Sequence, residues 1–128
     1  YNLRFFPETI ELGERIVADL KAQGIGAGMR GHHGGPDWHI YHDMYPITTH
    51  TGATANSCAY NCEAYRQQAG ERSYERGDCP AADDLYDRVI TIGLNQWYTE
   101  TDCQNVGQAI DRALALHCTQ SSDGAPWR

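Results

Sequence analysis

The sequence contains a single lysine, Lys21, and only two phenylalanines among its 128 residues. It also has no apolar run long enough to cross a bilayer, and its N-terminus lacks the basic and apolar regions of a signal peptide. Acidic residues outnumber Lys and Arg by 17 to 10, which gives a formal net charge of −7. Nucleic-acid binding requires a basic face, so we expect neither a nucleic-acid partner nor a membrane partner.

The five cysteines are an odd number, whereas a secreted disulfide framework usually uses an even one. We therefore expect reduced thiols and a cytoplasmic protein. A length of 128 residues with 41% hydrophobic residues suits one domain with a real core. The chain opens at Tyr1 as if inside a strand and without an initiator Met, which is typical of a fragment or a partial reading frame.

The N-terminal part predicts a strand followed by a helix. Residues 1–6 have the apolar content of a short strand, which Pro7 should end. Apolar residues then recur at helical spacing over 8–23, and Gly24 is well placed as a C-terminal stop. The segment 24–31, GIGAGMRG, contains G-x-G-x-x-G, but it follows a helix, whereas a phosphate loop follows a strand and opens a helix.

Alternating apolar and polar residues over 38–41, WHIY, predict a half-buried strand with His39 and Tyr41 on one face. The following stretch 48–77 is polar and rich in turn residues, with a possible helix near CAYNCEAYRQQ, residues 58–68.

The C-terminal part predicts helix, strand and helix. PAADDLYDR, residues 80–88, begins with a proline suited to a first helical turn, and VITIGL, residues 89–94, is a β-branched run typical of a buried strand. A last helix should begin after Thr99 as N-cap, with Asp102 completing a capping box.

These elements predict an α+β fold, a small and mostly antiparallel sheet covered by helices. We expect one domain over residues 1–118 and a disordered tail over 119–128.

Three segments resemble parts of one enzyme family. CPAADDLYDRVITIGLNQWYTETDCQNVGQAI (79–110) resembles the C-terminal end of the DegT/StrS family of PLP-dependent aminotransferases. QGIGAGMRG (23–31) is similar to the stretch that precedes the substrate-facing loop in that family, and HIYHDMYPI (39–47) is similar to an H-x-Y segment of one branch.

The resemblance implies the C-terminal small domain of a fold-type I enzyme, which usually acts as a homodimer. Such enzymes move an amino group from glutamate or glutamine onto a keto-sugar, often nucleotide-linked. The family's PLP-binding lysine, acidic partner and phosphate contacts belong to a large domain that this chain lacks. Lys21 lies on the expected first helix, where a solvated side chain is the usual outcome. We expect no PLP on this chain alone and no catalytic residue in it.

Four of the six histidines fall in RGHHGGPDWHIYHD, residues 30–43, and three interpretations of this stretch remain open. In the first, which the resemblance implies, it lines the substrate side of the PLP site. Arg30 would pair with a carboxylate or phosphate of the substrate, and nearby histidine and tyrosine side chains would hydrogen-bond to the substrate's hydroxyl groups. The substrate-binding set is then Arg30, His32, His33, His39 and Tyr41.

The second interpretation is a stand-alone binding module that holds a metal through the histidines together with Cys58, Cys62 and Cys79. In the third, these residues are structural, with Trp38, Ile40 and Tyr41 packing the sheet, the thiols acting as small hydrophobes and the histidines solvated or capping. An isolated small domain would also expose apolar surface, so we expect self-association.

Overall fold

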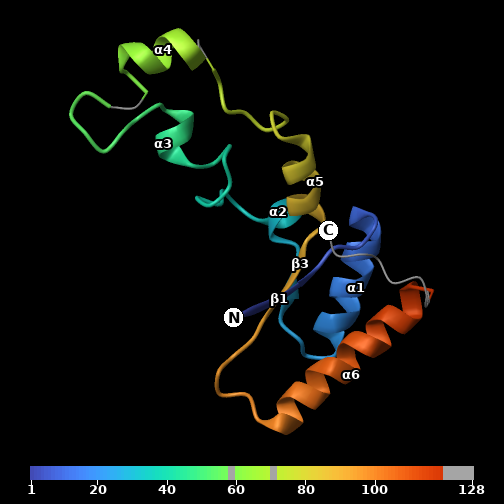
Figure 1. The fold of residues 1–128 in the computed structure, drawn as a ribbon. Helices are drawn as coiled ribbons and strands as arrows, with labels where there is room; N and C mark the ends of the chain where they lie inside the picture. Colours follow the sequence, from blue (N-terminus) through green and yellow to red (C-terminus); the bar gives the residue numbers. More distant parts are fainter. Residues whose placement is uncertain (58–59, 70–71, 120–128) are drawn as a thin grey trace. The chain divides into compact units, whose positions relative to one another are not determined.

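The computed structural model describes residues 1–57, 60–69 and 72–119, and of His33 only the backbone. This part of the chain contains three strands and six helices, and Figure 1 shows how they follow one another along the chain. In order they are β1 (Asn2–Phe5), α1 (Ile10–Ala22), β2 (Ala27–Gly28), α2 (Arg30–His33), α3 (Tyr45–Thr48), α4 (Glu63–Ala69), α5 (Pro80–Arg88), β3 (Ile90–Gly93) and α6 (Glu100–His117). The expected tail lies, from residue 120 on, outside the described residues.

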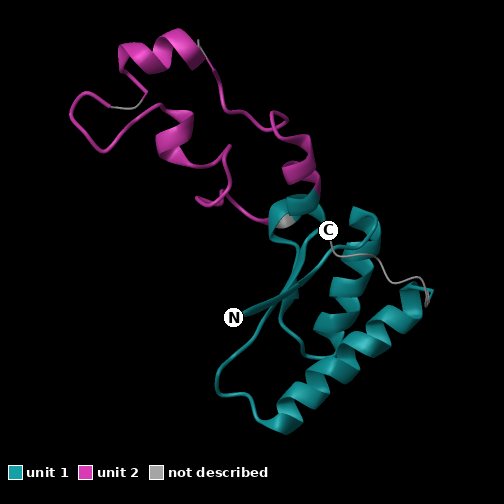
Figure 2. Cartoon of the chain, viewed as in Figure 1, with its two compact units in different colours: residues 1–33, 85–128 teal, residues 34–84 magenta. Residues whose placement is uncertain are grey.

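The chain divides into two compact units (Figure 2). Unit 1 comprises Tyr1–His33 and Leu85–Arg128 and contains the whole sheet with α1, α2 and α6. Unit 2 comprises Gly34–Asp84 and contains α3 and α4. The boundary at residues 84 and 85 falls within α5.

The sheet of unit 1 has the strand order β1-β3-β2, and both pairings are antiparallel. In register, Phe5 lies opposite Ile90, and both Leu3 and Ala27 lie opposite Ile92. Residues two apart on a strand share a face, so Ile90 and Ile92 point to the same side of the sheet. The predicted α+β class with a small antiparallel sheet is confirmed.

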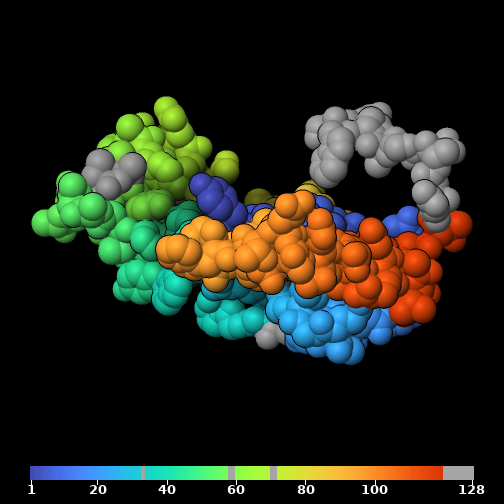
Figure 3. Space-filling view, turned by 90° about the horizontal axis from the view of Figure 1, so that it is seen from below, coloured from blue at the N-terminus to red at the C-terminus, as the bar shows by residue number. Residues whose placement is uncertain are grey.

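Two helices pack on that side of the sheet. Ile16, Val17 and Leu20 of α1 join Ile90 and Ile92 in one buried cluster, which also includes Ala27, Met29, Ala109 and Ala113. The two alanines are the buried residues of α6, and their small size lets α6 approach α1 closely. Figures 1 and 3 show α1 and α6 side by side, with the rest of α6 turned to solvent.

Local signals set the helix ends. The Thr9 hydroxyl accepts a hydrogen bond from the Leu12 amide at 3.1 Å at the start of α1, and Gly24 follows its end with φ +80°, the left-handed conformation that favours glycine. At α6 the expected capping box forms. The Asp102 amide donates to Thr99 Oγ1 at 3.2 Å, and the Thr99 amide donates to Asp102 Oδ2 at 2.8 Å.

The predicted strand over 38–41 is wrong, because this stretch forms consecutive turns. The Ile40 amide donates to the Asp37 carbonyl at 2.8 Å, and the Asp43 amide donates to the Ile40 carbonyl at 2.9 Å. The Asp37 carboxylate also accepts from the His39 amide at 3.0 Å, and this local bond competes with a strand ladder. Trp38 is therefore 63% exposed instead of packing a sheet.

None of the helices in the described ranges combines the length and the apolar character that crossing a bilayer requires.

The capping box of α6 yields a stability prediction. Thr99→Ala removes the hydroxyl acceptor and should lower the free energy of unfolding by about 1 kcal/mol. Urea unfolding followed by circular dichroism measures this change. Thr101→Ala, one position inside the exposed first turn, is the matched control and should change stability by less than about 0.5 kcal/mol. Equal losses for both variants would contradict a capping role for Thr99.

Candidate functional site

The five residues expected to bind substrate fall into two groups. Arg30, His32 and His33 form most of α2 in unit 1, whereas His39 and Tyr41 lie in the turns of unit 2. Neither unit by itself therefore brings all five together. His39 and Tyr41 also share no strand face, because the strand expected there is absent.

Helix α2 is fixed in unit 1 by close packing at Gly31. A Cβ atom on this residue would lie 2.1 Å from the Tyr86 carbonyl oxygen, so only glycine fits without movement of the backbone. In the next residue, His32, Nε2 lies 3.7 Å from a carboxylate oxygen of Glu14 on α1. Arg30 is exposed at the start of α2.

An exposed imidazole in unit 2 is oriented by a carboxylate. Asp37, only 7% exposed, accepts from the His39 amide and lies 2.8 Å from His39 Nδ1. The His39 side chain itself is 91% exposed. A carboxylate that holds Nδ1 leaves Nε2 free of that bond, so this nitrogen of His39 can hydrogen-bond a ligand.

The Tyr41 hydroxyl forms hydrogen bonds within unit 2. It donates to Asp83 Oδ2 at 2.9 Å and accepts from the Gly77 and Cys79 amides at 3.2 Å. Burial of the hydroxyl is the main cause that raises the Tyr41 pKa, and the bond to Asp83 adds to it. The hydroxyl stays protonated and joins the turns at 38–43 to the chain just before α5, so Tyr41 is engaged within unit 2.

The Asp43 carboxylate also stabilises these turns. Its Oδ2 accepts from the Asp37 amide at 2.7 Å, and its Oδ1 lies 3.1 Å from His42 Nδ1. The Asp37 amide is the largest cause that lowers the Asp43 pKa, and His42 contributes to the same effect. On the far side of the His42 ring, Nε2 lies 3.8 Å from Asp83 Oδ1, and both atoms are buried without a hydrogen-bond partner among the described residues.

In the described ranges, no three His, Cys, Asp or Glu side chains stand close enough to hold a metal ion. Cys58, one of the residues considered for such a site, lies outside those ranges. The structure therefore offers no described donor set to support the metal-binding interpretation.

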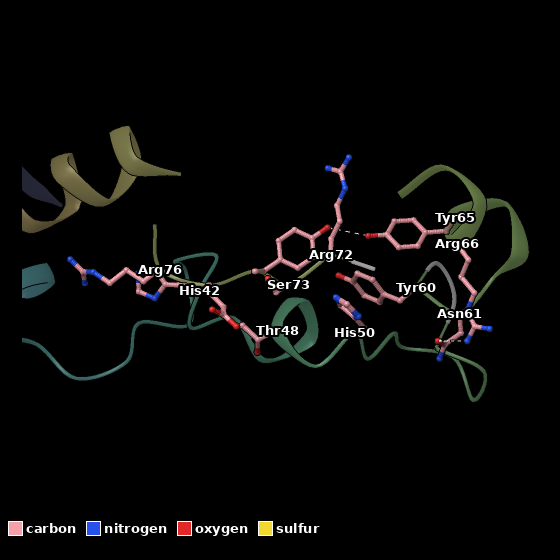
Figure 4. A pocket seen from close by; sticks show the side chains of 12 residues that line it. His42, Thr48, His50, Tyr60, Asn61, Tyr65, Arg66, Arg72, Ser73 and Arg76 are labelled. Carbon is pink, nitrogen blue, oxygen red and sulfur yellow. Dashed lines mark hydrogen bonds between the residues drawn. The ribbon is translucent and has the colours of Figure 1, made fainter. Parts of the chain in front are cut away.

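Unit 2 contains a pocket of about 1320 Å³ that the sequence did not predict (Figure 4). Its wall includes four rings that pack on one another. His50 stacks on Tyr60 with ring centres 5.4 Å apart, and Tyr65 meets Tyr60 edge to face at 5.8 Å. Tyr74 meets His50 edge to face, also at 5.8 Å.

Three arginines line the same pocket, namely Arg66, Arg72 and Arg76. Figure 4 shows Arg76 beside His42 at one end and Arg66 beside Asn61 at the other. The signal for this site was present in the sequence. Residues 34–84 contain eight acidic residues and three basic ones, and the three basic ones fall together in 66–76, with Tyr65 just before them and Tyr74 among them.

Comparison of the chain with protein-family models, with curated proteins and with solved structures finds no match.

The contacts of Tyr41 yield a prediction about local stability in unit 2. Tyr41→Phe removes the acceptor for the Gly77 and Cys79 amides, so hydrogen exchange at these two amides should accelerate about tenfold or more. Exchange measured by NMR reports this directly. Tyr45→Phe, in an exposed side chain of the same unit, should leave both amides unchanged. Unaltered exchange in Tyr41→Phe would contradict the assigned role.

The contacts of Asp43 yield a prediction about pH. Because the folded pKa is lowered, Asp43 contributes stability above its unfolded pKa, and this contribution disappears as the pH falls through the folded value. The NMR shift of the Asp43 carboxyl carbon should titrate below the ordinary midpoint of 3.8. His42→Ala should raise the midpoint only in part, since the Asp37 amide still donates. A midpoint at or above the ordinary one in the unmodified chain would refute this.

Proposed function

We propose that this chain is the substrate-side, C-terminal small domain of a PLP-dependent aminotransferase of the DegT/StrS type, acting on a keto-sugar that is nucleotide-linked. The observation that carries the proposal is the run of residues 79–110. This run resembles the family, and it forms α5, β3 and, after a loop at 94–99, most of α6. Because β3 is the central strand and α6 covers it, the segment that resembles the family is also the segment around which unit 1 is built.

The residues of this chain do not fit PLP itself. The cofactor requires a lysine for its Schiff base, and the only lysine, Lys21, is exposed near the end of α1. In the proposal, PLP is therefore held by a large domain and by the second subunit of a homodimer in the cytoplasm. When bound there, it supplies the electron sink for amine transfer.

The contribution of this chain is to bind and orient the substrate. Arg30 presents a planar guanidinium, which suits a phosphate or carboxylate through two parallel hydrogen bonds. His32 and the backbone of His33 lie on the same short helix, which the packing of Gly31 against Tyr86 holds in place. A rigid support of this kind reduces the ordering that a ligand would otherwise have to impose.

A binding module without catalysis is the second candidate. The pocket of unit 2 favours it, because a cavity lined by rings and charged side chains is the usual form of a ligand site.

The test of the proposed function uses the product of the complete reading frame to which this chain belongs. With PLP and glutamate it should transfer an amino group to a nucleotide-linked keto-sugar. Arg30→Gln should raise the KM for the keto-sugar about tenfold and leave kcat within about twofold, because it removes a binding contact. Arg15→Gln, an exposed arginine of α1, is the matched control and should change neither constant.

Absence of amine transfer by the complete product, across glutamate and glutamine as donors, would overturn the proposal. Equal KM values for Arg30→Gln and the control would show that Arg30 does not bind the keto-sugar. The isolated chain provides an independent check. After incubation with PLP and reduction with borohydride, mass spectrometry should detect no more adduct on Lys21 than on an exposed lysine of an unrelated protein.

A further inference from the structure

The pocket of unit 2 is rich in hydrogen-bond donors and positive charge. Arg66 donates to the amide oxygen of Asn61 at 3.2 Å, and Arg72 donates to the Ala69 carbonyl at 3.0 Å. Both acceptors are neutral, and in the described part of the chain neither guanidinium forms an ion pair. Arginine side chains next to a pocket are usually matched by an anion, so these two charges point to an anionic ligand.

The charge distribution in unit 2 strengthens this conclusion. Residues 34–84 carry more than twice as many acidic as basic residues, yet all three basic ones line the pocket, and among the described residues that line it Glu75 is the single carboxylate. Separation of this kind concentrates positive potential in one place on an otherwise acidic unit. An even distribution of the three arginines over the unit would not give this local positive potential.

The tyrosine hydroxyls add donors for a neutral part of the ligand. Tyr65 and Tyr74 share one hydrogen bond at 3.0 Å, which uses one of their two protons and leaves the other for a further acceptor. The bond to Tyr74 is the main cause that raises the Tyr65 pKa, which keeps the Tyr65 hydroxyl protonated. No hydrogen bond is formed by the Tyr60 hydroxyl within the described ranges. The pocket is therefore suited to a ligand with many oxygen acceptors.

Two features of His50 are typical of residues at ligand sites. Its Nε2 atom is buried without a partner among the described residues, and its backbone has φ 52°, in the left-handed region that non-glycine residues rarely adopt. Backbone strain and unmatched polar atoms collect at ligand sites, where the ligand supplies the missing partner.

We propose that this pocket binds a phosphorylated sugar, either free or as the sugar–phosphate part of a nucleotide. The phosphate is held by Arg66 or Arg72, and the sugar packs on the tyrosine rings, whose hydroxyls and His50 meet its oxygen atoms. A volume of about 1320 Å³ accommodates a molecule of nucleotide size. The site goes beyond the proposed transamination and does not rest on it, because it lies within one unit and requires no cofactor.

The test is titration calorimetry on this chain with ribose 5-phosphate and with uridine monophosphate. Ribose, uridine and inorganic phosphate serve as ligands that lack one part each. The phosphorylated sugars should bind with a Kd below about 1 mM, at least tenfold tighter than any of the incomplete ligands. Tighter binding of uridine monophosphate identifies a nucleotide as the ligand, and equal binding identifies the sugar phosphate alone.

Two variants probe the charges, and one matched variant controls for net charge. Arg66→Gln and Arg72→Gln keep the side-chain length and should weaken binding of the phosphorylated sugars, about tenfold for whichever arginine holds the phosphate. Arg4→Gln, on exposed β1 of unit 1, should leave the Kd within about twofold. Circular dichroism melts of all variants verify that each is folded.

Three results would overturn the proposal. The first is no binding of either phosphorylated sugar at about 10 mM. The second is inorganic phosphate binding as tightly as both, which would make the pocket a simple anion site. The third is equal weakening by Arg4→Gln and the pocket variants, which would reduce the effect to net charge. Amine transfer by the complete reading frame is measured separately, so failure of one proposal leaves the other intact.

Discussion

The central position of β3 is the constraint on which unit 1 depends. This four-residue strand pairs on both edges, and its two isoleucines are almost fully buried between the sheet and the helices. Because side chains alternate along a strand, moving the register by one residue would expose both isoleucines to solvent. The placement of β1, β2, α1 and α6 therefore follows from one short apolar sequence, ITIG.

The elements that could be predicted from the sequence are those whose signals are local and agree with one another. Helix α6 has an apolar stripe, an N-cap at Thr99 and its reciprocal partner Asp102, and it begins where these residues place it. Helix α1 ends before Gly24 for a similar reason. In both cases periodicity and capping favour the same structure, so tertiary contacts only need to reinforce it.

The stretch 38–41 could not be predicted from alternation, because a competing local interaction outweighs it. Asp37 is placed to bond the chain two residues on, and the glycines and proline just before it favour turns. The pocket of unit 2 escaped prediction for another reason. Its rings come from a turn, from α4 and from the segment after α4, and only the tertiary structure brings His50 onto Tyr60. Interleaved Tyr and Arg in 60–76 carried the information, but they have no simple period.

The separation of charge in unit 2 has a consequence for rates. An anion that approaches from solution first meets the field of a unit with eight carboxylates and only then the arginines at the pocket. Long-range repulsion slows association, whereas short-range attraction slows release. Added salt then acts in opposite directions on the two stages, because it screens the distant acidic charges and also weakens the final contact. Such a pocket would therefore bind its ligand with a low association rate and a low dissociation rate, and the two rates would respond differently to salt.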